Sequence, residues 1–176
     1  MIIIITYYIN ELNENYYQYN GGKDMTKLIL IYASMSGNTE MMAEEVATGV
    51  RQEGEEIEVI DITDGIEASV LENYDGIFLG AYTWGDGELP DEFFDFYDEM
   101  ESINLSGKKA AVFGSCDSGY PNFGAAVDIL MEKLRERGAE VYPKGLKVDN
   151  TPDVEEEEEC RDFGKEFISF LKTPVL

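Results

Sequence analysis

The sequence contains no histidine, so it lacks the side chain that proteins use most often as an acid or base near neutral pH and as a metal ligand. Its two cysteines, Cys116 and Cys160, form no recognisable metal or redox motif, which favours a reduced cytoplasmic protein. Only 13 basic residues face 37 acidic ones, and the net charge of -24 opposes nucleic acids and anionic membranes. The charge favours partners with basic surfaces, or alternatively serves solubility alone.

Long hydrophobic runs are also missing. The apolar stretch Met1–Ile5 is too short to cross a bilayer and lacks the features of a signal peptide. Gly21-Gly22-Lys23-Asp24 can be encoded by GGAGGTAAAGAT, a purine-rich ribosome-binding sequence just before the ATG of Met25. We therefore expect residues 1–24 to be a disordered leader or a mis-called start, and residues 25–176 to be the natural protein; a genuine flexible tail is the alternative.

From Lys27 onward, apolar runs typical of buried parallel strands alternate with segments of helical periodicity. The expected strands are 28–32, 57–60, 76–81, 110–113 and a fifth at 140–148, interrupted near Pro143. Helical spacing follows the first strand up to Gly54, and helices are also expected from Pro90, up to Gly138 and around Phe163–Leu171. This order predicts one α/β domain with a doubly wound, five-stranded parallel sheet.

Ligands of such sheets bind beyond the carboxyl ends of the strands, and the first of these ends carries Ser34-Met35-Ser36-Gly37-Asn38-Thr39. Its backbone N–H groups and hydroxyls can surround a phosphate at the start of the following helix. Because the loop contains no Lys or Arg, it favours a phosphate held by neutral donors over a nucleoside triphosphate. Taken alone, such a sequence is also an ordinary helix cap.

Two further loops follow neighbouring strands and carry exposed aromatic candidates. Tyr82–Gly87 contains the only tryptophan, Trp84, beside two glycines, and Ser115–Gly124 contains Tyr120. Each loop alone is compatible with an aromatic residue packed on the surface. Together with the phosphate loop, they predict a site for a flat ring with a phosphate tail.

These three segments resemble those of flavodoxins, and the similarity extends from about Lys27 to Lys172. Because the sequence has no long insertion after Leu146, it resembles the short-chain, bacterial type of flavodoxin. The resemblance implies a flavodoxin-like fold with strand order 2-1-3-4-5, and non-covalently bound FMN as the cofactor. Gly124 and Cys116 depart from residues found in some members of the family. The cofactor-binding residues that the resemblance implies are Ser34, Met35, Ser36, Gly37, Asn38, Thr39, Thr83, Trp84, Gly85, Asp86, Gly87, Ser115, Cys116, Asp117, Tyr120, Asn122, Phe123 and Gly124.

The implied function is low-potential one-electron transport between redox enzymes, through the neutral semiquinone and the reduced flavin, with no metal and no catalytic residue. Rotation of the Gly85–Asp86 peptide toward the flavin is expected to stabilise the semiquinone, and glycine makes that rotation inexpensive. Carboxylates near the ring, such as Asp86, Glu88, Asp91 and Asp117, are expected to lower the second potential. From this function we expect a monomer with two kinds of partner that have basic surfaces. The donor is a flavodoxin reductase or oxidoreductase, and the acceptor is a second enzyme.

Three alternative functions are compatible with this fold. A response-regulator receiver needs acidic residues after the first strand and an aspartate after the third, where this chain has Ala33-Ser34 and Ala81-Tyr82. An NAD(P)H-dependent quinone reductase is the stronger alternative, although no extra segment forms a substrate pocket. A flavin-binding partner dedicated to one enzyme, of the ribonucleotide-reductase-associated type, is the third.

Overall fold

Strand β1 (Leu28–Ala33) runs through a parallel sheet, with β2 (Glu58–Asp61) on one side and β3 (Gly76–Ala81) on the other. The computed structural model describes residues 26–174, so the expectation for residues 1–24 lies outside the described residues. The strand order β2-β1-β3-β4-β5 confirms the predicted order. The remaining strands are β4 (Lys109–Cys116), β5 (Glu140–Val141) and β6 (Leu146–Asp149).

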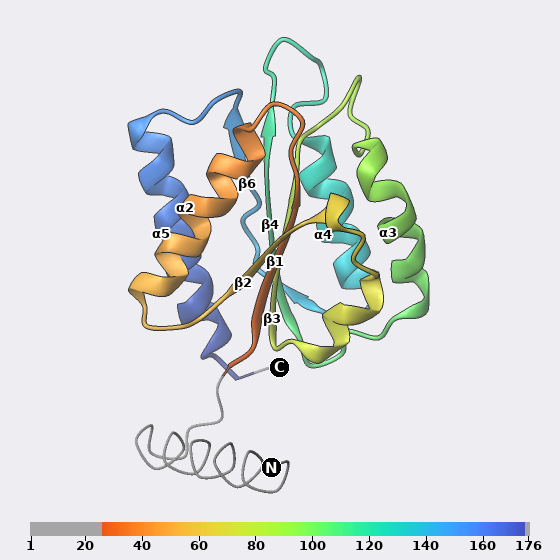
Figure 1. Ribbon diagram of the computed structural model, residues 1–176, viewed down its shortest axis with the longest axis vertical. Coiled ribbons are helices and arrows are strands. Elements are labelled where there is room, and N and C mark those ends of the chain that lie inside the picture. Colours follow the sequence, from red (N-terminus) through yellow and green to blue (C-terminus); the bar gives the residue numbers. More distant parts are fainter. Residues whose placement is uncertain (1–25, 175–176) are drawn as a thin grey trace, which may run out of the picture.

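Helices cover both faces of the sheet, with α2 and α5 on one face and α3 and α4 on the other (Figure 1). Side chains of β1 alternate between the two faces. Leu28, Leu30 and Tyr32 pack into a core with α2 and α5, whereas Ile29 and Ile31 pack into the core under α3 and α4. This double burial explains why the strand is apolar at every position. The helices are α2 (Asn38–Gln52), α3 (Phe94–Glu99), α4 (Ala125–Glu136) and α5 (Val154–Leu171).

The predicted fifth strand is two short strands, and both pair with β4. Strand β5 lies beside Lys109 and Ala110, and β6 lies beside the other half of β4, from Phe113 to Cys116. Pro143 lies between the two strands and has no N–H group for the ladder, which accounts for the break. The sheet therefore has a sixth strand beyond the five that were expected.

The helix predicted to open at Pro90 is α3 with a 3-10 turn at each end, Asp91–Phe93 and Met100–Ser102. A further 3-10 helix, Ala68–Asn73, has no counterpart in the sequence prediction. Within residues 26–174, no helix is long and apolar enough to cross a membrane.

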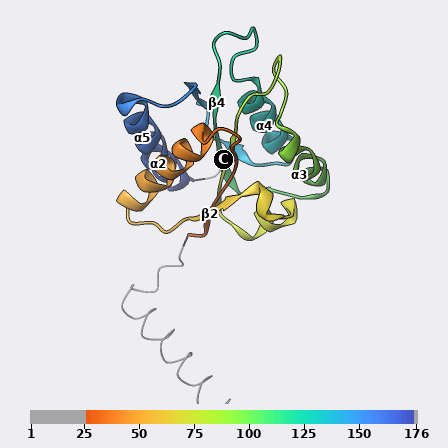
Figure 2. The same ribbon diagram turned by 45° about the horizontal axis from the view of Figure 1, so that its top comes forward.

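The parallel strands deliver three loops to one end of the sheet. These loops follow β1, β3 and β4, and they lie together at the top of the molecule in Figure 1 and come forward in Figure 2. The sequence therefore predicted correctly that three segments far apart along the chain meet at the carboxyl ends of the strands.

Candidate functional site

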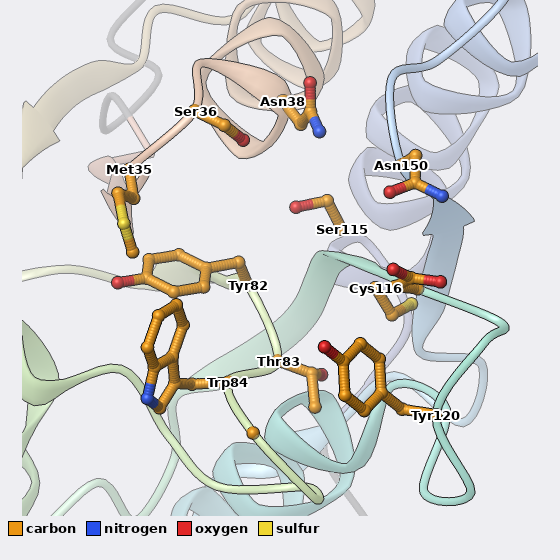
Figure 3. Close-up of a pocket in the computed structure, with 12 residues that line it drawn as sticks. Met35, Ser36, Asn38, Tyr82, Thr83, Trp84, Ser115, Cys116, Tyr120 and Asn150 are labelled. Carbon is orange, nitrogen blue, oxygen red and sulfur yellow. The ribbon is translucent and has the colours of Figure 1, made fainter.

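A cavity of about 400 Å³ opens between these three loops, at the carboxyl ends of β1, β3 and β4. Figure 3 shows side chains from separate elements around it. Ten of the residues that were predicted from sequence contribute to its wall, and Tyr82 and Asn150 join them. The lining residues are Met35, Ser36, Asn38, Tyr82, Thr83, Trp84, Gly85, Ser115, Cys116, Asp117, Tyr120 and Asn150.

The loop before α2 presents backbone donors to this cavity. Within residues 26–174, the N–H groups of the four residues Ser36–Thr39 have no hydrogen-bond partner. Gly37 adopts the left-handed conformation, with φ of 87°, and a Cβ atom there would meet nothing within 4 Å. The side-chain oxygen of Ser34 caps the helix instead, because it accepts a hydrogen bond from the N–H of Glu40 at 3.1 Å. Free N–H groups at a helix N-terminus form an anion site.

Two hydroxyl groups connect this loop to the sheet. Thr39 is fully buried, and its Oγ1 atom lies 2.8 Å from Oγ of Ser115, at the end of β4. The side chain of Thr39 therefore holds the loop against the sheet, while its N–H group stays among the free donors. A second contact joins the start of α2 to the segment after β6, because Thr151 donates to Oδ1 of Asn38 at 2.9 Å.

Two exposed aromatic side chains flank the cavity, one from each of the other loops (Figure 3). Trp84 is 51% exposed and Tyr120 is 52% exposed, although both are large and largely apolar. Such rings remain accessible on the surface where they contact a ligand or a partner. The ring of Tyr82 packs edge-to-face against Trp84, with centroids 6.2 Å apart, and its hydroxyl donates to Glu92 at 3.0 Å. Burial and this bond raise the pKa of Tyr82 to about 12.

The loop that carries Trp84 is a tight turn closed by backbone bonds. Trp84 and Glu88 exchange N–H to carbonyl bonds of 3.0 and 2.9 Å, and the N–H of Gly87 also donates to the Trp84 carbonyl. Gly85 and Gly87 both have positive φ angles, 52° and 123°. Within residues 26–174, neither the carbonyl of Gly85 nor the N–H of Asp86 has a hydrogen-bond partner. The peptide between them is the unattached part of the turn.

The tyrosine-bearing loop is fastened to β6. Asp149 accepts hydrogen bonds from the hydroxyl and the N–H of Ser118, at 2.6 and 3.0 Å, and these bonds lower its pKa. The next residue, Asn150, lines the cavity with a φ of 62°, and its N–H donates to the carbonyl of Cys116 at 2.7 Å. Sequence reasoning missed Asn150. The sequence feature that could have revealed Asn150 is an asparagine directly after a strand, because asparagine tolerates the left-handed conformation.

Eight predicted residues are not among those that line the cavity. Asp86 and Gly87 lie in the Trp84 turn, and Gly124 precedes α4 with φ of 69° and packs against Lys147. The amide of Asn122 is turned toward the Trp84 turn, where it donates to the carbonyl of Asp86. Direct contact of these residues with a cofactor stays a prediction. The residues that were predicted but do not line the cavity are Ser34, Gly37, Thr39, Asp86, Gly87, Asn122, Phe123 and Gly124.

The groups in the cavity wall are mainly backbone donors, hydroxyls and aromatic rings. The only thiol in the wall is that of Cys116, and burial raises its pKa to about 12, so it carries no thiolate at neutral pH. Within residues 26–174, no group of three or more acidic, cysteine or histidine side chains is arranged to hold a metal ion. Neutral donors at the helix end and two aromatic rings fit a phosphate joined to a flat heterocycle. The fold is a doubly wound α/β sheet, and the cavity lies at the carboxyl ends of its strands, where such sheets bind their ligands.

Comparison with known proteins identifies the family. The family model described as flavodoxin matches residues 30–164. A curated probable flavodoxin 2 from Bacillus subtilis is 46% identical over 143 residues, which cover 81% of this chain and 95% of that protein. A flavodoxin from Maridesulfovibrio salexigens is 40% identical, over 75% of this chain and 92% of its own length. The crystal structure of oxidised flavodoxin 1 from Bacillus cereus is 65% identical, with a TM-score of 0.80 over 82% of this chain and 98% of the other. The chain belongs to the flavodoxin family, whose members are electron-transfer proteins that bind flavin.

Proposed function

We propose that this protein binds FMN tightly but non-covalently and carries single electrons between redox enzymes, through the neutral semiquinone and the reduced flavin. The observation that carries the proposal is the cavity between a cation-free anion site and two exposed aromatic rings, Trp84 and Tyr120. FMN supplies the redox chemistry when it is bound, and the protein supplies binding, orientation and electrostatics.

The residues around the cavity have distinct roles in this proposal. The N–H groups of Ser36–Thr39 bind the phosphate, assisted by the dipole of α2. Trp84 and Tyr120 flank the isoalloxazine, each adding about 0.5–1.5 kcal/mol beyond the burial of area. The free Gly85–Asp86 peptide offers a carbonyl that can turn toward the ring. No side chain is required as an acid or base.

The surface beside the cavity supports a carrier that meets basic partners. The exposed carboxylates there include Asp86, Glu88, Asp91 and Asp117, in a chain whose net charge is -24. Such a surface steers basic proteins toward the flavin edge and raises association rates. The proposed donor is a flavodoxin reductase or another oxidoreductase, the acceptor is a second enzyme, and the protein acts as a monomer in the cytoplasm.

An anaerobic reductive titration of the purified protein, followed by absorbance, tests the proposal. We expect FMN to co-purify with the protein and to be reduced in two one-electron stages, with a blue neutral radical between them. Direct two-electron bleaching by NADPH, without that stage, would contradict the carrier function and point to a reductase.

A further inference from the structure

We propose that Asn122 is a positioning residue that ties the tyrosine-bearing loop to the tryptophan-bearing turn and leaves only the Gly85–Asp86 peptide free to rotate. The inference rests on the proposed function, because the purpose of that rotation is to adjust the protein to the redox state of the flavin. Asn122 itself stands outside the cavity wall.

The tie is a hydrogen bond between a side chain and the backbone. The amide of Asn122, on the loop after β4, donates to the carbonyl of Asp86, on the loop after β3. The two residues are 36 positions apart in the chain, so the bond joins two elements that no local sequence connects. It is made by protein atoms alone, so no cofactor atom is needed as a partner.

The two loops approach closely at this point. A Cβ atom on Gly87 would lie 2.8 Å from Cβ of Asn122 and 3.2 Å from Cβ of Ala125, so only glycine fits beside the tie. A second contact runs in parallel, because the N–H of Ala126 donates to Oγ1 of Thr83 at 3.4 Å. Trp84 and Tyr120 are thereby held in one connected unit rather than on two independent loops.

The bonds fix the turn on both sides of one peptide. On the upstream side, the backbone of Trp84 is held by its bonds with Glu88. On the downstream side, the carbonyl of Asp86 is held by Asn122. The Gly85–Asp86 peptide between them has no protein partner within residues 26–174. Rotation is therefore confined to ψ of Gly85 and φ of Asp86, while the positions of the neighbouring residues are retained.

This arrangement predicts what the loss of the amide does. Without the tie, the turn samples more conformations, and the chain has to order it again whenever the peptide engages the flavin. The one-electron-reduced protein, which depends on the rotated peptide, then becomes less stable relative to the fully oxidised and fully reduced proteins. The comproportionation constant, which measures the preference for the one-electron stage, is expected to fall.

Asn122→Leu tests the tie, because leucine resembles asparagine in shape and has no donor. Asn73→Leu is the matched control, since Asn73 is exposed at the end of the 3-10 helix Ala68–Asn73 and its side chain makes no hydrogen bond within residues 26–174. Amide hydrogen exchange at Gly87 and Glu88 is measured on the apoprotein, and the comproportionation constant on the FMN-loaded protein. We expect about 2- to 10-fold faster exchange in Asn122→Leu only, as befits one lost hydrogen bond. We expect the constant to fall by up to the square of that factor, because two molecules at the one-electron stage form in each comproportionation.

Each outcome decides one part of the inference. Unchanged exchange in Asn122→Leu, and in Asn122→Asp as a second variant without a donor, would overturn the tie itself. Faster exchange with an unchanged constant would overturn its role in the redox cycle and leave a local structural bond. Failure of the unsubstituted protein to bind FMN or to show a one-electron stage would instead refute the proposed function, while the exchange data would still decide whether the tie exists.

Discussion

The hydroxyls of Thr39 and Ser115 lie 2.8 Å apart, both buried, and join the first turn of α2 to the end of β4. Each residue was predicted from sequence as a cofactor contact, yet the structure turns their hydroxyls toward each other. The pair fixes the separation between the anion site and the neighbouring loop. A ligand that bridges the two therefore meets a spacing that is already set, which lowers the ordering cost of binding.

Thr39→Val is expected to lower the free energy of unfolding of the apoprotein by about 1–3 kcal/mol, because the Ser115 hydroxyl is left buried without this partner. Urea denaturation measures the change. Ser115→Ala and the double variant complete a cycle. Both single variants remove the same bond. The sum of their two costs in unfolding free energy is therefore expected to exceed the cost of the double variant by about 0.5–3 kcal/mol. Strictly additive costs would show that the two hydroxyls do not interact.

Gly85→Ala is expected to decrease the yield of the blue semiquinone during anaerobic titration. Gly85 has a φ of 52°, where an alanine costs about 1–2 kcal/mol, and its Cβ atom would lie 2.2 Å from Oε2 of Glu88. Both effects disfavour the turn that holds the Gly85–Asp86 peptide beside the cavity, and an altered turn no longer offers its carbonyl to the flavin. Gly54→Ala is the control, since Gly54 has a φ of 79° and nothing within 4 Å of the added atom. A yield in Gly85→Ala equal to that of the unsubstituted protein would argue against the rotation.

The sequence was sufficient for features whose chemistry is local. Apolar runs such as Leu28–Tyr32 predict buried parallel strands because a strand covered on both faces must be apolar throughout. The loop Ser34–Thr39 predicts free backbone donors because helix N-termini carry unpaired N–H groups wherever they occur. In a parallel sheet, the loops that follow the strands then all lie at the carboxyl ends of those strands.

Features that depend on pairing between distant segments were not predictable in this way. Asn150 reaches the cavity because β6 pairs with the second half of β4, which the interrupted run at 140–148 did not reveal. Tyr82 joins the wall through its packing against Trp84. Asn122 was expected at the cofactor, and its bond to Asp86 depends on how two loops approach in space.

Neutralising the carboxylates beside the cavity is expected to raise the second one-electron potential. A carboxylate ~10 Å from the ring, at an effective dielectric constant of ~40, disfavours a flavin anion by ~0.8 kcal/mol, or roughly 35 mV. Asp86→Asn and Asp117→Asn remove exposed charges near the site, whereas Glu136→Gln removes one at the far end of α4. Dye-equilibrated potentiometry measures each shift. Equal potentials in all three variants would refute the electrostatic explanation.

Electron transfer from a basic reductase is expected to slow as ionic strength rises. At 0.1 M salt the screening length is about 10 Å, so attraction between exposed surfaces weakens steeply above that concentration. Stopped-flow measurements between about 0.02 and 0.5 M salt test this dependence. Asp86→Asn is expected to flatten the curve, and Glu136→Gln is expected to leave it unchanged. A rate that is independent of salt for the unsubstituted protein would rule out electrostatic steering.

Alkaline pH is expected to destabilise the protein, through its buried thiols first. Burial raises the pKa of Cys116 and of Cys160 to about 12, from 9.0 for an unperturbed thiol. Between these values the unfolded chain loses the thiol protons and the folded chain keeps them, so stability is complete below about pH 9 and falls as pH rises above it. Tyr32, Tyr74 and Tyr82, whose pKa values are raised from 10.0 to about 12, add to the loss above pH 10.

Cys160→Ala separates one of these contributions, because Cys160 is fully buried and lies on α5, away from the cavity wall. The variant is expected to lose one titrating proton, and its free energy of unfolding should fall less steeply between pH 9.5 and 11, by about 1.4 kcal/mol per pH unit. Urea denaturation at a series of pH values measures both slopes. Parallel curves would mean that Cys160 titrates equally in the folded and unfolded chains, which would contradict the burial that raises its pKa.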